Sequence, residues 1–232
     1  MTTSPRRSAA RPARRRNEPG EAQPGPDRRL NILRSAERRF AAHGFHGVSI
    51  RDIAEEAGVP LALVGYYFGP KVDLYHAIFR ERTGYIQERL QTLAQVQRDS
   101  PPAFLLDEVV RAFVLPVLEV AATPDGRVFL RVMARGITDQ LAEDEPLIRE
   151  LFDPLAHAFI DALTRAVPQA SRGTLAWCYQ FALGALLHHV IDARVERLSL
   201  GENRPGDGEA AGPLLMRFIA AGIRGACAAP TH

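Results

Sequence analysis

Side chains that could bind a phosphate or a base edge cluster between residues 49 and 71 of this sequence. Arg51 stands near the start of the stretch, and Tyr66, Tyr67 and Lys71 stand near its end. An arginine can form two parallel hydrogen bonds to guanine, whereas hydroxyl and ammonium groups mostly bind phosphates and carry no sequence information. The chemistry that this combination favours is nucleic-acid binding.

Two short helices must position these groups. Ser49 is a good N-cap, and Asp52 three residues later completes an acidic form of the capping box. Gly58 supplies a sharp turn, and Pro60 suits the first turn of a second helix, which we expect at about residues 61–68. Two helices joined by a tight glycine turn are the geometry that lays the second helix in a DNA major groove.

This stretch resembles the DNA-binding part of the Tet repressor (TetR) family of bacterial regulators. The resemblance covers roughly residues 27–75 and rests on residue types at fixed spacing, namely Gly44, Phe45, residues 49–54, 57–59 and 67–69, Lys71 and Leu74. It implies a three-helix DNA-binding domain and a homodimer that binds a palindromic operator. Pro60 and Leu61 replace the small polar or basic residues usual in the family, and Gly65 replaces a common tyrosine. These departures alter the base-reading surface rather than the fold.

The resemblance assigns DNA contacts to nine residues, which are Ser49, Arg51, Leu61, Ala62, Leu63, Gly65, Tyr66, Tyr67 and Lys71. Four of these positions in the second helix would face the groove, namely Leu61, Ala62, Leu63 and Gly65. None has a side-chain donor or acceptor, so they could touch a thymine methyl but could not form paired hydrogen bonds with a purine. Arg51 is then the only nearby side chain able to grip guanine. The alternative for Arg51 is a solvated charge or another phosphate contact.

Composition limits the class of protein. The chain has 232 residues and a net charge of only +2, so it is not a basic nucleic-acid coat as a whole. Its two cysteines, Cys178 and Cys227, form neither a disulfide framework nor a metal pattern, and they fit the reducing cytoplasm, where we expect the protein. No apolar run approaches the roughly 20 residues that span a membrane, so we expect no membrane partner.

Residues 1–26 form a tail whose composition predicts disorder, because it cannot bury enough apolar area to fold. Its arginines cluster ahead of the first acidic residue, at Arg6, Arg7, Arg11, Arg14, Arg15 and Arg16. One interpretation is a solvated tail or a mis-assigned start codon. The other is a basic arm that follows phosphates or enters a minor groove.

The remaining pattern predicts an all-α fold of about nine helices. We expect a three-helix DNA-binding domain at residues 27–70, which includes a first helix at about 27–42, and a helical regulatory, ligand-binding and dimerisation domain at residues 71–232. In the second domain we expect one long helix at 71–98 and further helices that begin near 101, 124, 145, 171 and 213. The helix that begins near 124 should end near 136, and the one that begins near 171 should end near 198. A flexible connection is expected at 200–212. Pro116 and Pro154 should bend their helices.

The last two predicted helices are rich in small residues, at Ala182, Gly184, Ala185, Ala220, Ala221, Gly222, Gly225 and Ala226. Small side chains let helices approach closely, and a helix that is apolar on more than one side needs more cover than its own domain usually gives. Either these are buried core helices of a monomer, or they form a two-fold interface between two copies. The family resemblance favours the homodimer.

A ligand cavity is predicted in the second domain from its aromatic, methionine and polar residues. The candidates are Phe104, Phe113, Met133, Arg131, Phe152, His157 and Trp177. Apolar cavities with a few polar groups are the usual ligand sites between helices, although residues of these types more often fill a core. The ligand itself is not identified by the sequence.

Two sets of acidic and histidine residues have the spacing of metal ligands on one helix face. They are Asp153, His157 and Asp161, and His188, Asp192 and Glu196. Because such sets without cysteine are a weak metal signal, we interpret them as surface charge ladders and expect no metal and no cofactor. Phosphate loops, nucleophile elbows and dinucleotide motifs are also missing from the sequence, which argues against an enzyme.

The sequence therefore predicts a cytoplasmic, homodimeric transcriptional regulator that binds a double-stranded DNA operator. We expect a repressor that an unknown small-molecule effector releases from a palindrome. The alternatives are a regulator controlled by a partner protein without a small ligand, a helical enzyme joined to a DNA-binding fold, and a nonspecific architectural DNA-binding protein.

Overall fold

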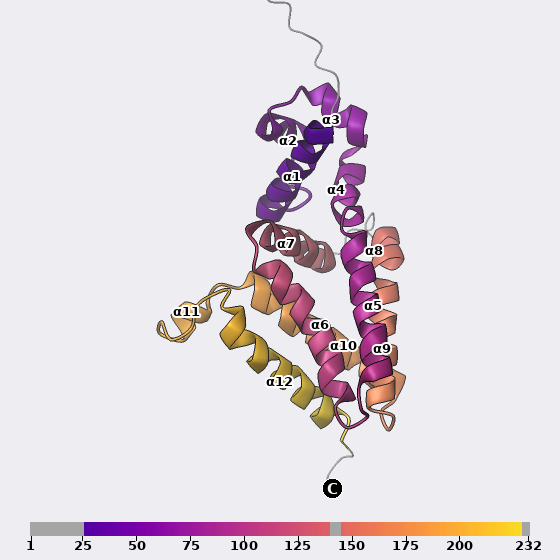
Figure 1. Ribbon diagram of the computed structural model, residues 1–232. Helices are drawn as coiled ribbons and strands as arrows, with labels where there is room; N and C mark the ends of the chain where they lie inside the picture. The colour runs from indigo at the N-terminus through magenta and orange to yellow at the C-terminus, as the bar shows by residue number, and fades with distance from the viewer. Residues whose placement is uncertain (1–25, 140–144, 229–232) are drawn as a thin grey trace, which may run out of the picture.

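The computed structural model describes residues 26–139 and 145–228, and all regular structure in these two ranges is α-helical (Figure 1). The predicted all-α fold, with a helix-turn-helix at the N-terminal end and a helical C-terminal part, is confirmed. The arginine-rich tail predicted at residues 1–26 lies outside the described residues, except for Pro26, which begins the first helix.

Twelve helices make up the described part. Their bounds are α1 Pro26–His43, α2 Ile50–Ala57, α3 Leu61–Phe68, α4 Lys71–Arg80, α5 Thr83–Asp99, α6 Leu105–Ala121, α7 Pro124–Asp139, α8 Glu145–Leu151, α9 Asp153–Ala166, α10 Arg172–Ile191, α11 Val195–Leu198 and α12 Gly208–Ala226. Within the described ranges, no helix combines the length and the apolar character that crossing a membrane requires.

The helices separate into two ends of an elongated molecule (Figure 1). Helices α1, α2 and α3 form one end, and α4 leads from them into α5 along one side. Helix α7 packs across α1, while α6, α10 and α12 pack together toward the other end. The helix-turn-helix is therefore joined to the rest of the molecule by α4 and by the contact between α1 and α7.

Aromatic rings pack together where α1, α4 and α7 meet. Phe40 of α1 meets Tyr75 of α4 edge to face with ring centroids 5.2 Å apart, and Tyr75 meets Phe79 at the same separation. Phe79 in turn contacts Phe129 of α7 at 6.3 Å. A Cβ on the buried Gly136 would lie 2.8 Å from the Tyr75 hydroxyl, so a larger residue where α7 passes α4 would force the Tyr75 side chain to shift.

The predicted long helix at 71–98 is wrong, because it is divided into α4 and α5. The Thr83 hydroxyl donates to the carbonyl oxygen of Arg80 at 3.0 Å, and the Arg82 N–H donates to the Phe79 carbonyl, three residues back, at 3.0 Å. These local bonds replace the regular helical ladder. The apolar spacing alone did not reveal the break, although Thr83 and Gly84 are weak helix formers.

Pro154 breaks the helix predicted from about residue 145 rather than bending it. Helix α8 ends at Leu151, and α9 begins at Asp153 with Pro154 in its first turn. A proline lacks the N–H of the helical ladder and clashes with the carbonyl four residues earlier, so the first turn of a new helix is its favoured place.

The helix predicted from about residue 171 begins at Arg172 with Ser171 as its N-cap, but it ends at Ile191 rather than near 198. The Asp192 carboxylate accepts a hydrogen bond from the Arg194 N–H at 2.8 Å and also binds the Arg194 guanidinium. An aspartate that bonds the backbone two residues later forms a turn, which separates α11 from α10. The guanidinium of Arg194 holds the pKa of Asp192 well below its usual range.

Two other predicted helix starts are also corrected. The helix expected from Pro101 begins at Leu105, because the Phe104 N–H bonds the Pro101 carbonyl in a turn at 3.0 Å. The helix expected from Pro213 begins at Gly208, because the Asp207 carboxylate caps it by accepting from the Ala210 N–H at 3.0 Å. Pro213 then lies inside α12, and the connection predicted at 200–212 ends at Asp207.

Candidate nucleic-acid interface

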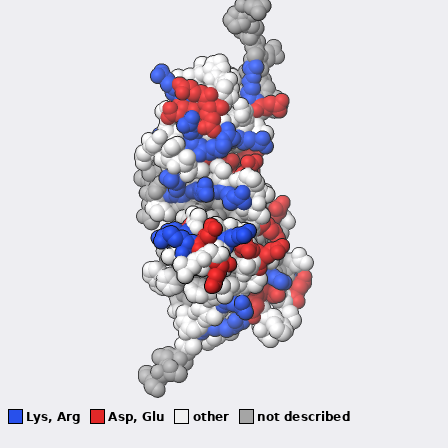
Figure 2. All heavy atoms as spheres, turned by 90° about the vertical axis from the view of Figure 1, so that its left-hand side faces the viewer, with Lys and Arg blue, Asp and Glu red and all other residues white. Residues whose placement is uncertain are grey.

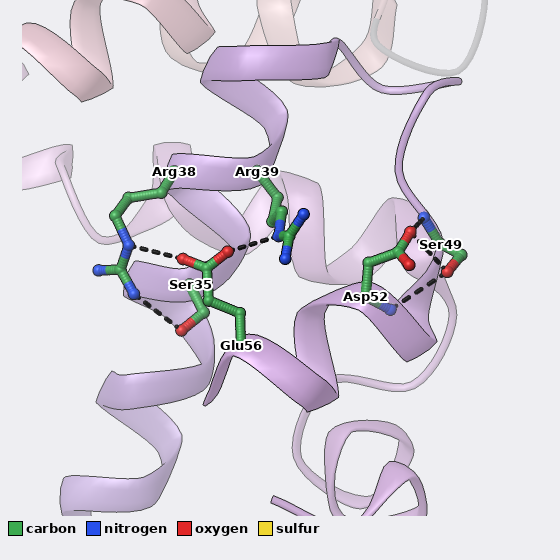
Figure 3. Close-up of polar contacts among 6 residues, drawn as sticks. All are labelled: Ser35, Arg38, Arg39, Ser49, Asp52 and Glu56. Carbon is green, nitrogen blue, oxygen red and sulfur yellow. Dashed lines mark hydrogen bonds and ion pairs between the residues drawn. The ribbon is translucent and has the colours of Figure 1, made fainter. Parts of the chain in front are cut away.

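Helix α2 starts at a complete capping box. The Ser49 hydroxyl accepts from the Asp52 N–H at 3.2 Å, and the Asp52 carboxylate accepts from the Ser49 N–H at 2.8 Å (Figure 3). The hydrogen bond from the Ser49 backbone lowers the pKa of Asp52. The predicted N-cap role of Ser49 is therefore confirmed, and its side chain has a structural task whether or not it also contacts DNA.

Charged side chains fix α2 on α1. The carboxylate of Glu56 lies between two guanidinium groups of α1, and it accepts from Arg38 Nε at 2.7 Å and pairs with Arg39 (Figure 3). Arg38 also donates to the Ser35 hydroxyl at 3.1 Å. At the same end of α2, the Asn31 amide donates to the Ala57 carbonyl oxygen at 2.7 Å. Two arginines of α1 are thus used inside the domain.

Gly58 makes the turn between α2 and α3. Its φ of 65° is left-handed, and the Val59 N–H bonds the Ala54 carbonyl oxygen at 3.0 Å to close the end of α2. This is the helix ending for which glycine is favoured, because a Cβ is strained at that φ. Helix α3 then begins at Leu61 and ends at Phe68, as predicted.

Helix α3 buries one face and exposes the other. Val64 is fully buried and Phe68 is nearly so, while Leu61 is 47% exposed and Tyr66 is 73% exposed. Ala62 and Gly65 are also exposed. Three of the four predicted groove-facing positions thus lie on the open face, whereas the side chain of the fourth, Leu63, packs partly against the core.

Arg51 lies in the first turn of α2 with its side chain exposed. Unlike Arg38 and Arg39, it forms no hydrogen bond or ion pair with the other described residues. Tyr66 and Tyr67 meet at an angle with ring centroids 5.5 Å apart, and Tyr67 is half-buried. The open face of α3 therefore offers one well-exposed phenol beside an apolar surface, and α2 offers one exposed guanidinium.

Lys71 has a role that the sequence did not reveal. Its ammonium group donates to the carbonyl oxygens of Phe45 and Val48 at 2.9 and 3.0 Å, and it lies 4.3 Å from the centroid of the Phe45 ring. It thereby ties the start of α4 to the loop between α1 and α2. The turn signal Gly44, whose φ is 72°, marks that loop in the sequence but does not indicate which cation closes it.

Charge is mixed on the face of the molecule that lies on the left-hand side of Figure 1 and is turned toward the viewer in Figure 2. Basic side chains form bands across the upper half of the face, and acidic side chains gather at the end that holds the helix-turn-helix. Helix α2 itself carries Asp52, Glu55 and Glu56. This face therefore shows no broad positive surface.

The seven predicted ligand-binding residues do not surround one cavity. Phe113 lines a small apolar hollow with Phe159 and Tyr179, and Met133 is buried in the core. Phe104 and Trp177 are 62% and 60% exposed.

The other three candidates are also dispersed. Arg131 lines a surface groove with His189, and Phe152 is half-buried against Phe79 with ring centroids 6.0 Å apart. His157 is exposed beside Arg172, which pairs with Asp161. Over the described residues, no group of three or more His, Cys, Asp or Glu side chains could hold a metal ion.

Helices α10 and α12 expose large apolar side chains side by side. Trp177 and Phe181 stack with ring centroids 5.9 Å apart and are 60% and 66% exposed. Leu214 and Phe218 of α12 are 61% and 67% exposed. A groove of about 210 Å³ runs between the two helices and is lined in part by Gly222. Apolar surface of this extent is typical of an interaction site.

Two family models match this chain. The model described as bacterial regulatory proteins, tetR family, matches residues 32–78, and the model described as Tetracyclin repressor-like, C-terminal domain, matches residues 111–222. The first covers the helix-turn-helix and α4, and the second covers most of the helices from α6 to α12.

Similar proteins agree with these models. The chain is 34% identical over 74 residues to the HTH-type transcriptional repressor AcnR of Corynebacterium diphtheriae, a match that covers 31% of this chain and 39% of AcnR. It is 35% identical over 80 residues to the HTH-type transcriptional regulator RutR of Escherichia coli, which covers 34% of this chain and 36% of RutR. The chain thus matches less than half the length of these relatives.

The fold has known counterparts over most of its length. The crystal structure of PfmR, a TetR family transcriptional regulator from Thermus thermophilus, matches with a TM-score of 0.55 and 20% identity, and the match covers 80% of this chain and 97% of PfmR. With both family models and this fold, the chain belongs to the TetR family.

Proposed function

We propose that this TetR-family member is a sequence-specific transcriptional regulator that acts in the cytoplasm and binds a palindromic operator as a homodimer. The observation that carries the proposal is the open face of α3, which packs against α2 and α4 and exposes Leu61, Ala62 and Gly65. Arg51, in the first turn of α2, is exposed as well. A recognition helix that presents its outer face in this way fits a DNA major groove.

Base reading in this proposal is divided between two kinds of contact. The apolar face of α3 meets thymine methyl groups, and the Arg51 guanidinium makes a bidentate contact with guanine. Tyr66 and Tyr67 hold phosphates and set the position of the domain on the duplex. Lys71 and Ser49 support this surface from within, through the loop between α1 and α2 and through the cap of α2. Lys71 Nζ carries three protons and its two backbone bonds use two of them, so one is available for a phosphate.

Dimerisation in the proposal uses the exposed apolar face of α10 and α12. Trp177, Phe181, Leu214 and Phe218 would be covered by the same residues of a second copy around a two-fold axis. Covering these side chains removes apolar area from water, which is the main driving force of association. The two helices of each copy would then form a four-helix interface, with Gly222 allowing close approach.

Ligand control would act through the break between α4 and α5. Arg82 at this break pairs with the nearly buried Glu37 of α1 at 3.3 Å, and its guanidinium lies 4.7 Å from the ring centroid of Phe129 in α7. A ligand that shifts α5 or α7 would therefore change the support of α1. The spacing of the two recognition helices would follow, provided that the ligand binds the two conformations with different affinity.

The proposal is tested with the DNA immediately upstream of the gene. The purified protein should protect an inverted repeat there, and it should bind that repeat more tightly than random DNA of equal length at the same salt concentration. Equal affinity for both would contradict sequence-specific binding and favour an architectural role, because phosphate contacts alone do not distinguish sequences.

A further inference from the structure

The α5 helix holds a buried cation that no described carboxylate neutralises. Arg89 is only 8% exposed, and α5 packs between α6 and α9 at this point (Figure 1). Arg89 forms no ion pair with the described residues, in contrast to Arg82 seven residues earlier, which pairs with Glu37. Arginine side chains are rarely this buried unless they are paired.

Aromatic rings and one carbonyl take the place of a carboxylate around Arg89. Its guanidinium carbon lies 5.6 Å from the ring centroid of Tyr85, 5.7 Å from that of Phe113 and 5.4 Å from that of Phe159. One terminal nitrogen donates to the Phe113 carbonyl oxygen at 3.0 Å. These contacts orient the guanidinium but leave its positive charge and most of its hydrogen-bonding capacity available.

Two buried donors at this place lack an acceptor. The Nε of Arg89 and the hydroxyl of Tyr85 are both buried and have no partner within hydrogen-bonding geometry. Burial raises the pKa of Tyr85, so its hydroxyl keeps its proton at neutral pH and can donate. Buried polar groups are nearly always satisfied. The Tyr85 oxygen can accept from the Arg89 guanidinium, but the proton of the Tyr85 hydroxyl and the Nε–H of Arg89 still have no acceptor among the described residues.

Arg89 and Tyr85 also line a groove that is open to solvent. The groove has a volume of about 430 Å³, and Pro116 and Val120 give it an apolar wall. On the other side of Arg89, the rings of Phe113 and Phe159 line the small apolar hollow. The guanidinium thus stands between a solvent-accessible groove and an apolar interior, as a recognition group for an amphipathic ligand would.

Acidic residues at the groove restrict the charge of such a ligand. Glu88, Glu119 and Asp125 line the groove and are exposed. These carboxylates would repel a phosphate or another polyanion on its way to Arg89. A single carboxylate meets less repulsion, and its two oxygens match the fork of an arginine.

We propose that Arg89 and Tyr85 bind the carboxylate of a small organic monoanion whose apolar body rests on the groove wall. The assignment of this ligand as the effector rests on the proposed function, whereas the binding site itself does not. In the bound state one carboxylate oxygen accepts from Arg89 Nε, and the carboxylate also accepts from the Tyr85 hydroxyl. The ligand thereby satisfies the two buried donors.

The test is calorimetric titration of the full chain with benzoate and hexanoate, and with benzamide as the neutral counterpart of benzoate. We expect the carboxylates to bind and benzamide to bind at least about tenfold more weakly, because it lacks the charge that Arg89 recognises. Failure of both carboxylates to bind at millimolar concentration, or equal binding of benzamide, overturns the proposal.

Matched variants locate the site. Arg89→Met keeps the length of the side chain and removes its charge, and Tyr85→Phe removes only the hydroxyl. We expect carboxylate affinity to fall about tenfold or more in the first and several-fold in the second, while Arg98→Met, an exposed arginine of the same helix, retains wild-type affinity. Unchanged affinity in both Arg89→Met and Tyr85→Phe overturns the proposal, and Tyr85→Phe keeps it testable if Arg89→Met fails to fold.

Operator binding is measured separately with and without benzoate. If the carboxylate binds through Arg89 but leaves operator affinity unchanged, the site stands and its role as an effector site fails. If the chain binds no operator at all, the proposed function fails and the titration still decides the site.

Discussion

The helix-turn-helix and the α10–α12 region leave different kinds of side chain exposed. In the helix-turn-helix, Glu56 lies between Arg38 and Arg39, Lys71 closes a loop, and the exposed guanidinium of Arg51 bonds none of the described residues. In the α10–α12 region, large apolar side chains such as Trp177 are left open instead. The first region is complete as a fold and presents a small polar contact, whereas the second is incomplete without another surface.

This difference indicates what each region is expected to meet. Exposed apolar area is stabilised by a protein surface that excludes water, and a free arginine next to a recognition helix is suited to a base edge. Substitutions in the two regions should therefore have different effects. Those in α10 and α12 should change assembly, and those in the helix-turn-helix should change stability or DNA recognition.

Gly222→Arg should abolish the dimer. Gly222 is exposed, and a Cβ added there meets nothing within 4 Å, so the isolated chain accommodates the new side chain. In a dimer through α10 and α12 its charge would be buried without a partner, at a cost of roughly 3–5 kcal/mol. Sedimentation should show a monomer, with weakened operator binding.

Gly84→Arg is the matched control, since a Cβ at this α5 position also meets nothing within 4 Å. It should leave the dimer intact. A Gly222→Arg variant that dimerises as strongly as the wild type would place the interface elsewhere and remove the contrast between the two regions.

Lys71→Met should lower the free energy of unfolding by about 1–3 kcal/mol, because the half-buried carbonyl oxygens of Phe45 and Val48 lose their charged donor. Methionine retains the unbranched apolar stem, so packing is largely kept. Chemical denaturation measures the effect. Unchanged stability together with a loss of DNA affinity would mean that Lys71 serves only as a phosphate contact.

Glu37→Gln should change how stability depends on pH. Burial raises the pKa of Glu37 above its ordinary value of 4.5, and the positive charge of Arg82 opposes this rise. The folded state then holds the proton more tightly than the unfolded state, so this contribution to stability is present below pH 4.5 and is lost as the pH rises through the folded pKa.

Denaturation of both proteins across this range gives the test. The stability of the wild type relative to Glu37→Gln should decrease as the pH rises above 4.5. A difference that stays constant, or that changes in the opposite direction, would mean that the ion pair with Arg82 dominates over burial. The effect should be the smallest of the set, because Arg82 compensates part of the burial.

Local signals made the helix-turn-helix predictable. Ser49, Asp52 and Gly58 each specify the backbone within a few residues, and the structure has α2 and α3 at the expected bounds. In the C-terminal part the same reasoning missed the break at Thr83 and the turn at Asp192, because apolar spacing continues across both. Side-chain hydrogen bonds to the backbone decided these breaks, and hydrophobic periodicity does not report them.

The proposed ligand site was less predictable for a different reason. The sequence indicates aromatic residues at helical spacing, but Phe104 and Trp177 became exposed and Met133 became core. Arg89 was not among the candidates, because a single arginine in a charged helix resembles a solvated residue. Its burial depends on Phe113 and Phe159, which lie on α6 and α9 and which only the packed structure brings to it.

Selection of binding sites from random DNA, carried out with the wild type and with Arg51→Ala, tests whether Arg51 reads a base. We expect a wild-type palindrome with a guanine in each half-site. We also expect that Arg51→Ala loses preference at that base pair alone, and that affinity for the wild-type site falls by about 1–3 kcal/mol. Tyr67→Phe should instead weaken binding to all sequences about equally. If Arg51→Ala keeps the wild-type preference at every position, the open guanidinium of the helix-turn-helix does not read DNA, and the account is contradicted.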